Sequence, residues 1–431
     1  MFDLSGPIVR SRLEPDFYKF TMGGLIWRKY RDVQVTFSFT NRTARARLGR
    51  VVDIGELREQ LEHARSLMFT NSELHYLRGT HQYHDRMFTE DYLEFLRCLR
   101  LPEYEIAAQG DDLVIEVSGA WSEVTYWETI VLSIVNELYY RTLLGRVSRF
   151  ERQAIFAEGI RRLRDKIRTL RARPDIVFSD FGTRRRFAGP WQHFVIESLR
   201  DELNGGGAAG QFLGTSNTFA AMTSGVPTMG TSAHELPMVI AGLLDTGSAD
   251  PAWLAAAQRQ VLGDWWEQYG WGLSIFLPDT FGTEFFFTVA SQADLHAWKG
   301  FRWDSGSLQE FGEGVIRHYE EAGVDPRTKL LVPSDALDLP VILDAQARFG
   351  GRIRVSYGWG TGLTNDLLEN VMIEGAWFGP MSLVMKATRA NGRGLVKLSD
   401  NPAKATGDPA DIERYRQAAS YTTREGVLPK Y

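Results

Sequence analysis

The chain has 431 residues, of which 44% are hydrophobic and 24% are charged, and its formal net charge is −5 at pH 7. These values are ordinary for a globular protein, and the length predicts one large domain with a smaller one beside it. The net negative charge argues against general nucleic-acid binding, although it leaves room for a local basic pocket.

A single cysteine, Cys98, excludes an internal disulfide and fits a reducing compartment. Residues 1–15 contain scattered charges and lack the apolar core of a signal peptide. No uninterrupted apolar run approaches the roughly 18 residues that a membrane helix needs. We therefore expect a cytoplasmic protein with neither a membrane nor a nucleic-acid partner.

The first 120 residues carry signals for both helices and strands. Residues 16–30 begin with an N-cap acid and have apolar residues at helical spacing, and residues 33–40 alternate as a half-buried strand does. Residues 105–107 and 113–117 flank a turn sequence and predict a hairpin. Three short helices are predicted at 54–64, 72–78 and 89–99. This part is therefore expected to be a mixed α+β domain.

A long apolar helix is predicted at 123–144, and it bridges to a second domain. From residue 149 onward, helical segments alternate with short strands, which are predicted at 176–178, 211–213, 274–277, 300–303, 329–332 and 352–356. The last five run into Gly, Ser, Thr or Asp, which is the pattern of a (β/α) barrel with its site at the strand C-termini. The polar, Pro- and Gly-rich tail from 395 contains one more predicted strand at 396–398.

The segment 178–190 has the richest chemistry in the chain. An acid, the aromatic ring of Phe181, a glycine and three arginines follow a buried strand. An exposed ring beside guanidinium groups suits a flat aromatic ligand that carries or meets phosphate, because arginine binds phosphate oxygens bidentately. The alternative is a solvated basic turn.

Four further segments stand at predicted strand ends: 214–217, 230–235, 300–306, and 334–335 with the glycine-rich 356–362. Glycines there free backbone N–H groups to surround phosphate. Taken singly each is more often a loop, but together they indicate one site. Two other motifs are discounted. Residues 205–210 resemble a dinucleotide-binding motif, but they follow a predicted helix and are expected to end it. His234 and Glu235 begin like a zinc-binding motif, but Met238 stands where the second histidine is required.

These segments resemble the nicotinate phosphoribosyltransferase family. The resemblance rests on residues 16–23, 179–187, 214–218, 230–235, 300–306, 334–338, 357–366 and 396–407, in the family's order. It implies an α/β fold with an irregular, incomplete (β/α) barrel and a discontinuous α+β N-terminal domain. The barrel is expected at 146–375, and the split domain, 1–145 with 376–431, is expected to contribute to a neighbour's site in a homodimer.

The family condenses nicotinate with 5-phosphoribosyl 1-diphosphate to nicotinate mononucleotide and diphosphate, in salvage toward NAD. Positive charge builds on the sugar during this displacement, as in glycoside cleavage, and carboxylates stabilise it. Asp304 and Asp335 are the candidates here. Mg²⁺ is expected to arrive with the substrate, with these two carboxylates as possible ligands and no ion fixed by the protein alone.

Other roles follow from the resemblance residue by residue. Phe181 and Tyr18, the latter from the partner subunit, are expected to sandwich the pyridine ring, and the remaining pyridine contacts are Asp16, Thr215 and Ser216. Phosphate contacts are expected from Arg184, Arg302, Gly360 and Thr361. Many members couple turnover to ATP hydrolysis through a phosphorylated histidine. His234 is the candidate, since an imidazole can accept a phosphoryl group near neutral pH; the alternative is a buried structural histidine.

Two positions bear on the choice of substrate. The related nicotinamide enzymes carry an acid at the place of Ser216, and a carboxylate substrate tolerates a hydroxyl better than an acid, which favours nicotinate. The family commonly has a second acid at the place of Ser307, so contacts to ribose or metal are weakened here. The alternatives are a nicotinamide phosphoribosyltransferase and a catalytically inactive nucleotide-binding barrel.

Overall fold

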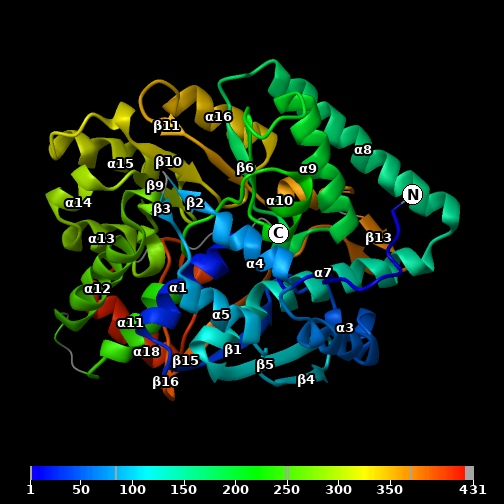
Figure 1. The fold of residues 1–431 in the computed structure, drawn as a ribbon, viewed down its shortest axis with the longest axis horizontal. Coiled ribbons are helices and arrows are strands. Elements are labelled where there is room, and N and C mark those ends of the chain that lie inside the picture. Colours follow the sequence, from blue (N-terminus) through cyan, green and yellow to red (C-terminus); the bar gives the residue numbers. More distant parts are fainter. Residues whose placement is uncertain (1, 83–84, 248–249, 251, 369–370, 423–431) are drawn as a thin grey trace.

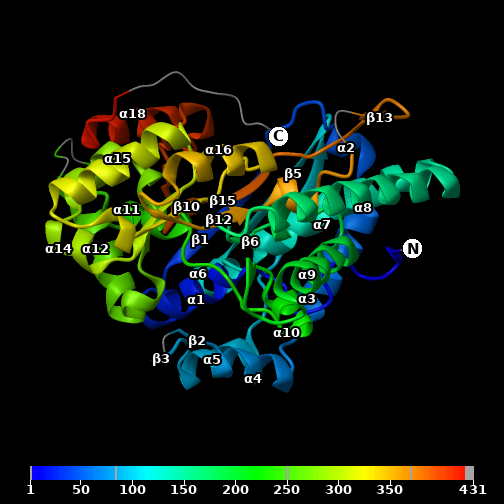
Figure 2. The same ribbon diagram turned by 90° about the horizontal axis from the view of Figure 1, so that it is seen from above.

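The computed structural model describes residues 2–82, 85–247, 250, 252–368 and 371–422. Figure 1 shows an antiparallel sheet with its helices on one side of the molecule and a curved arrangement of parallel strands and helices on the other. In Figure 2 helices α4 and α5 lie at one edge of the molecule and α18 lies at the opposite edge.

The antiparallel sheet contains strands from both ends of the chain. Its order is β16-β15-β1-β5-β4, and all its pairings are antiparallel. The strands are β1 Gln34–Asn41, β4 Tyr104–Gln109, β5 Asp112–Ala120, β15 Leu383–Ala390 and β16 Arg393–Gly394. Because β15 pairs with Val35–Asn41 of β1, the sheet is completed by residues more than 340 positions away in the chain. This arrangement confirms the discontinuous N-terminal domain.

The predicted N-terminal helices are present. Two of them begin at capping side chains: Asp53 accepts from the Glu56 N–H, and Thr70 forms a capping box with Glu73. The elements of this part are α1 Phe17–Lys29, α2 Leu48–Val51, α3 Ile54–Ser66, α4 Asn71–Gly79, β2 His81–Gln82, β3 Asp85–Arg86, α5 Glu90–Cys98, α6 Trp121–Val124 and α7 Trp127–Arg146. Helix α7 is buried nearly all round, as expected of a helix between two layers.

The second part is an irregular, incomplete barrel of two parallel sheets. One has the order β11-β10-β9-β8 and the other β12-β6-β7. The strands are β6 Phe178–Asp180, β7 Phe212–Thr215, β8 Ile275–Phe276, β9 Gly300–Trp303, β10 Leu330–Pro333, β11 Arg354–Val355 and β12 Tyr357–Trp359. The chain passes from one sheet to the other at Ser356, whose N–H donates to Leu331 while the next N–H donates to Val177.

Helices connect the strands of this second part. They are α8 Arg149–Arg171, α9 Gly189–Asn204, α10 Thr218–Ser224, α11 Glu235–Leu244, α12 Ala252–Tyr269, α13 Thr283–Val289, α14 Gln292–Ala297, α15 Leu308–Glu321, α16 Leu339–Phe349 and α17 Thr361–Thr364. The remaining elements are β13 Val371–Ile373, β14 Ala376–Phe378, α18 Pro409–Ala418 and the 3₁₀ turns η1 Thr183–Arg185, η2 Gly270–Leu273, η3 Pro278–Thr280, η4 Pro326–Thr328 and η5 Pro402–Lys404. Gly205 ends α9 in the left-handed conformation, so the helix-terminator prediction is confirmed.

Three predictions of secondary structure are wrong. The expected glycine-rich loop 356–362 contains strand β12, because its backbone pairs with β6. The expected strand at 396–398 is reduced to an isolated bridge between Lys397 and Thr406. The predicted helix at 123–144 is divided into α6 and α7. Within the described residues no helix is both long and apolar enough to cross a membrane.

Candidate active site

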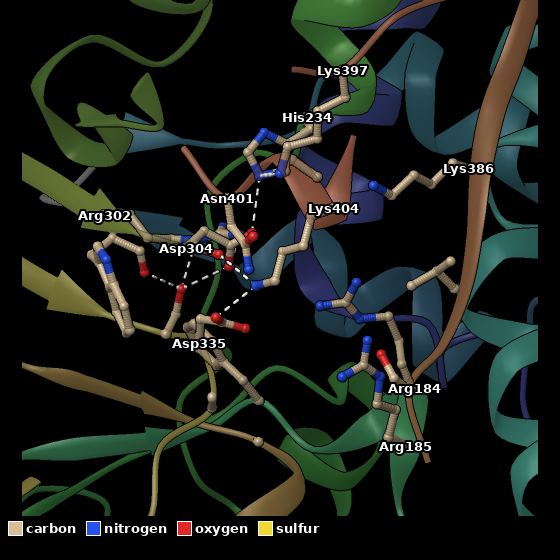
Figure 3. Close-up of a pocket in the computed structure, with 18 of the residues that line it drawn as sticks. Arg184, Arg185, His234, Arg302, Asp304, Asp335, Lys386, Lys397, Asn401 and Lys404 are labelled. Atoms are coloured by element: carbon tan, nitrogen blue, oxygen red, sulfur yellow. Dashed lines mark hydrogen bonds and ion pairs between the residues drawn. The ribbon is translucent and has the colours of Figure 1, made fainter. Parts of the chain in front are cut away.

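A cavity of about 620 Å³ lies where the C-terminal ends of the parallel strands face strand β15 of the antiparallel sheet. Its walls come from α1, α7, several barrel loops and the segment 382–404. Figure 3 shows that cationic and acidic side chains from these distant segments point into one space. The cavity therefore lies at the strand ends, where the sequence predicted a site, and both domains of one chain build it.

Aromatic rings define one end of the cavity. Phe181 directly follows β6, and its N–H donates to the Trp359 carbonyl at 2.9 Å. Its ring lies on Gly358, where an added Cβ would stand 2.4 Å from the ring carbons, so this position admits only glycine without a shift of the ring. Tyr18 of α1 lines the same cavity, and the Arg184 guanidinium lies 5.7 Å from the centre of the Tyr18 ring. A flat ligand can stack at this end.

Three predicted pyridine contacts lie behind the wall rather than in it. Ser216 Oγ donates to Asp16 Oδ1 at 2.6 Å, and Thr215 Oγ1 donates to Asp180 Oδ2 at 2.7 Å. All four side chains are buried, and none is among those that line the cavity. Asp16, Thr215 and Ser216 therefore lie behind the cavity wall in this structure, and their contact with the pyridine stays a prediction. They hold in place the segments that carry Tyr18 and Phe181.

Burial controls ionisation behind this wall. It raises the pKa of Asp180 to about 6, despite hydrogen bonds from Thr215 and Gln192 that favour the carboxylate. It also raises the pKa of Asp16, against the opposing effect of Arg184. The hydroxyl of Ser216 is engaged by Asp16, so it does not face a substrate directly, and the argument for nicotinate from Ser216 loses its proposed contact.

Arg184 belongs to the ring end of the cavity. Its Nε lies 3.5 Å from Asp16 Oδ2, and its Nη1 lies 3.4 Å from Glu128 Oε1. Glu128 also pairs with the fully buried Lys19 at 2.5 Å, and Lys19 makes a second short contact with Glu235. Arg184 is thus held by two carboxylates beside the Tyr18 ring. This position favours a contact with the pyridine as well as the predicted contact with phosphate.

His234 lies in a close set of charged groups at the other end. Its Nε2 is 2.9 Å from Asp304 Oδ2 and 2.9 Å from Lys397 Nζ, while its Nδ1 is 2.9 Å from Thr280 Oγ1. Burial, followed by the positive charge of Lys397, lowers the pKa of His234 to about 4. The imidazole is therefore neutral at pH 7. A neutral imidazole carries one N–H. If that hydrogen is on Nε2, Nε2 donates to Asp304, and if it is on Nδ1, Nε2 accepts from Lys397.

The two predicted sugar-facing carboxylates are both in the cavity. Arg302 Nη2 lies 3.5 Å from Asp304 Oδ1, and Lys404 Nζ lies 2.6 Å from Asp335 Oδ2. Burial opposes ionisation of Asp304, but Arg302 and His234 hold its pKa well below the usual range. Burial raises the pKa of Asp335 despite the nearby Lys404 ammonium. Two acids in one cavity thus have different proton affinities.

Several residues that line the cavity were not predicted from the sequence. The cavity receives Arg42 and Lys386, from either side of the β1–β15 pairing, and Lys397 and Lys404 from the tail. Burial and the charges of Lys397 and Arg42 hold the pKa of Lys386 well below its ordinary value. No spacing along the chain signals this group, because the lysines converge only when the C-terminal segment packs against the barrel.

The glycine-rich segment at β12 also reaches the cavity through Gly360 and Thr361. Lys166 of α8 supports it from behind, with Nζ 2.8 Å from the Gly362 carbonyl and 2.5 Å from Asp366. Ser307, which stands in place of the family's usual acid, lines the cavity and caps α15 by accepting from the Glu310 N–H at 3.3 Å. Its hydroxyl thus has a defined local role.

Among the described residues, His234, Asp279 and Asp304 offer ligand atoms within 4.8 Å of one another, the spacing of a metal site. Lys397 Nζ, however, lies 2.9 Å from His234 Nε2 and 3.3 Å from Asp279 Oδ2. This ammonium already supplies the positive charge that a metal would bring. The cluster is therefore better described as a histidine held between acids and a lysine.

Aromatic rings, two carboxylates and numerous cations at the ends of parallel strands are features that suit an enzyme transferring a phosphorylated sugar to a flat base. The comparisons with known proteins agree. Residues 13–136 match the model of the nicotinate phosphoribosyltransferase N-terminal domain, and residues 176–423 match the model of the nicotinate phosphoribosyltransferase family. The chain belongs to the nicotinate phosphoribosyltransferase family.

Solved structures of this family have the same fold. A nicotinate phosphoribosyltransferase from Vibrio cholerae is 29% identical, with a TM-score of 0.84, and the match covers 97% of this chain and 96% of that one. One from Porphyromonas gingivalis is 28% identical, with a TM-score of 0.81, over 96% of this chain and 100% of that one. The similarity therefore spans both domains.

Proposed function

We propose that this enzyme transfers the phosphoribosyl group of 5-phosphoribosyl 1-diphosphate to nicotinate, giving nicotinate mononucleotide and diphosphate in cytoplasmic salvage toward NAD. The observation that carries the proposal is a single cavity in which the Phe181 and Tyr18 rings stand at one end and Asp304 and Asp335 lie among cations. The aromatic rings suit a pyridine, the carboxylates suit a ribose and the cations suit phosphates, and the proposed reaction needs all three in one cavity.

In the transfer step the nicotinate ring nitrogen attacks C1 of the ribose. The bond from C1 to the diphosphate oxygen breaks, and its electron pair leaves on diphosphate, so no proton has to move. Asp304, which is ionised, stabilises the positive charge on the sugar. Arg302 and Lys404 hold Asp304 and Asp335 in place and provide charge for the phosphates.

Magnesium fits this cavity as an ion that accompanies the substrate. Asp304 and Asp335 supply carboxylate oxygens of the kind that Mg²⁺ binds, and both line the cavity. Bound there, the ion would neutralise charge on the leaving diphosphate. Asp335 would exchange its contact with Lys404 for this role.

The coupling to ATP is proposed to run through His234. With Nδ1–H donating to Thr280, the lone pair on Nε2 is available, and burial keeps the ring neutral because the pKa of His234 is lowered to about 4. Nε2 forms a bond to the γ-phosphorus as the bond to the bridging oxygen breaks, and ADP leaves with that electron pair. The proton on Nδ1 stays in place. Lys397, beside Nε2, is placed to receive the phosphoryl oxygens.

The pyridine end is proposed to be complete within one chain. Tyr18 and Phe181 line the same cavity, and Asp16 is bonded to Ser216 of its own chain. A homodimer stays a prediction from the resemblance. Contribution of Asp16 and Tyr18 to a neighbour's site, as that resemblance implied, is not needed to form the pocket.

The test is a direct assay of nicotinate mononucleotide with purified enzyme, 5-phosphoribosyl 1-diphosphate and Mg²⁺, with and without ATP. We expect product with nicotinate at a higher kcat/KM than with nicotinamide. A higher value with nicotinamide would favour the nicotinamide enzyme. Formation of neither nucleotide would favour an inactive nucleotide-binding barrel.

A further inference from the structure

A second cavity, of about 400 Å³, adjoins the active-site cavity. Four residues line both spaces: Gly306, Ser307, Glu310 and Asp400. The far walls of the second cavity are the turn at Phe281 and Gly282, α13, the middle of α15 and the chain after α18. A molecule that spans the two spaces would have one part among the cations of the first and another part in a chamber of different chemistry.

Aromatic side chains form part of the walls of this second chamber. It is lined by Phe281, Phe285, Phe287, Phe311, His318 and Tyr421. The rings of Phe287 and His318 are stacked with centroids 3.7 Å apart, and burial lowers the pKa of His318, so this imidazole is uncharged at neutral pH. Aromatic faces of this kind stack on flat rings.

The two cavities also differ in charge. The first is lined by seven lysines and arginines (Arg42, Arg184, Arg185, Arg302, Lys386, Lys397 and Lys404) and by six acids (Glu128, Glu235, Asp304, Glu310, Asp335 and Asp400), so cations are in slight excess there. Of the described residues that line the second, only Arg317 is a lysine or arginine, whereas Glu284, Glu310 and Asp400 are acids. Phosphates are therefore favoured in the first cavity and disfavoured in the second, which suits an uncharged group.

The junction lies beside the groups that hold His234. Asp304 contacts His234 Nε2 at 2.9 Å, and the next residue, Ser305, donates from Oγ to Asp279 at 2.6 Å and accepts from the Asp400 N–H at 3.1 Å. Gly306 follows with a φ of 77°, and a Cβ there would stand 3.1 Å from Asp400. Gly306 therefore packs closely against Asp400, and both residues belong to the boundary that the two cavities share.

We propose that the second cavity binds the adenosine part of ATP while its phosphates extend through the junction toward His234. This inference rests on the proposed coupling to ATP, and it deepens that proposal by assigning the nucleoside a place apart from the pyridine end. The base stacks among the aromatic walls. Thr283 Oγ1 donates to Asp400 and Thr288 Oγ1 donates to the Phe285 carbonyl, and the lone pairs of both hydroxyls can accept from ribose hydroxyls or the exocyclic amine.

Gly314 gives a test confined to the second cavity. It lies within α15 and lines only the second space, and the nearest atom to an added Cβ is Arg317 Nη2 at 4.0 Å. Gly314→Ala is expected to fold at least as well as wild type, because glycine is unfavourable inside a helix. Gly314→Leu fills part of the chamber. The matched control is Gly263→Leu in α12, where an added Cβ would meet nothing within 4 Å.

The measurement is calorimetric binding of ADP and, separately, of inorganic tripolyphosphate. We expect ADP binding to weaken progressively from wild type to Gly314→Ala to Gly314→Leu, reaching about 10-fold or more, as steric overpacking of a site does. Tripolyphosphate binding is expected to stay unchanged, and Gly263→Leu is expected to match wild type with both probes.

Unchanged ADP affinity in Gly314→Leu would overturn the inference, as would equal loss of both probes, since that would place the effect at the phosphates. No ADP binding by wild type would overturn it too. ADP binding that Gly314→Leu weakens, in an enzyme that hydrolyses no ATP and incorporates no phosphate at His234, would refute the coupling and leave the nucleotide site standing. If Gly314→Leu melts at a lower temperature than Gly263→Leu, the comparison of wild type with Gly314→Ala decides the outcome.

Discussion

The two ends of the active-site cavity are built by different physical means. At the ring end, Phe181 and Tyr18 are held by a buried network of mostly short hydrogen bonds, such as those from Ser216 to Asp16 and from Thr215 to Asp180. At the histidine end, His234 is held by charges of both signs that lie within a few ångströms. The ring end is therefore determined mainly by shape and the histidine end mainly by charge. Substitutions at the ring end should change KM for nicotinate, and substitutions at the histidine end should change kcat or the pH dependence.

The largest effect is expected from removing charge at the histidine end. Asp304→Asn keeps the size of the side chain but takes away the carboxylate nearest the sugar, so kcat should fall by at least about 100-fold. Steady-state assays of nicotinate mononucleotide formation measure this. Asp325→Asn is the control, because Asp325 is an exposed acid paired with Arg327 in η4. A change below 10-fold in Asp304→Asn would remove Asp304 from the proposed role.

Mixing two inactive variants tests whether the ends belong to one chain. We expect no recovery of activity when Tyr18→Ala and His234→Ala subunits are combined with ATP present, because both side chains line the cavity of the same chain. Mass spectrometry of the mixture verifies subunit exchange if the protein is oligomeric. Recovery toward one quarter of wild-type activity would show instead that neighbouring subunits share their sites.

The pH dependence should separate the ends next. Burial and the charge of Lys397 lower the pKa of His234 to about 4, so phosphorylation from γ-labelled ATP should be nearly constant between pH 5.5 and pH 8. In Lys397→Met the lysine charge is lost while Asp279 and Asp304 remain, so the pKa of His234 rises. Labelling of this variant should therefore fall as the pH is lowered through 6. Equal profiles for the two proteins would contradict the assignment.

The smallest effect is expected at the ring end. Gly358→Ala places a Cβ where the ring of Phe181 now lies, so the ring must move and its stacking with nicotinate weakens. Since an aromatic pair contributes about 0.5–1.5 kcal/mol, KM for nicotinate should rise by about 2- to 10-fold. KM for 5-phosphoribosyl 1-diphosphate should not change. A rise in both constants would indicate a wider disturbance of β12.

The same contrast explains what could be predicted from the sequence. Phe181 and the ring end stand directly after a strand, and local patterns locate strands well enough to bring such residues to one edge. Strand β9 was predicted with its observed bounds, whereas β12 was missed because a three-residue strand containing glycine is defined only by pairing with β6. Asp16 and Ser216 were predicted to contact the pyridine. Whether their side chains face the cavity or each other depends on tertiary packing, which local sequence patterns do not specify.

The charged end was predictable only in part. Asp304 and Asp335 follow predicted strands, His234 lies in the predicted segment 230–235, and all three are in the cavity. The lysines of the C-terminal segment carry no local signal, because their position depends on contacts between segments more than 100 residues apart, such as the one between Lys397 and Asp279. Even so, the family resemblance included residues 396–407, which contain Lys397 and Lys404. The resemblance therefore indicated this segment, whereas the periodicity of apolar residues did not.

The pairing of β1 with β15 has a consequence for the synthesis of the enzyme. On the ribosome, residues 34–41 emerge early, and their partner strand at 383–390 emerges near the end of translation. Until then β1 has an unpaired edge, a known route to association between chains. Expression yield should therefore depend on translation speed and on chaperones that shield nascent strands. A chain that ends before residue 383 would leave this edge open permanently.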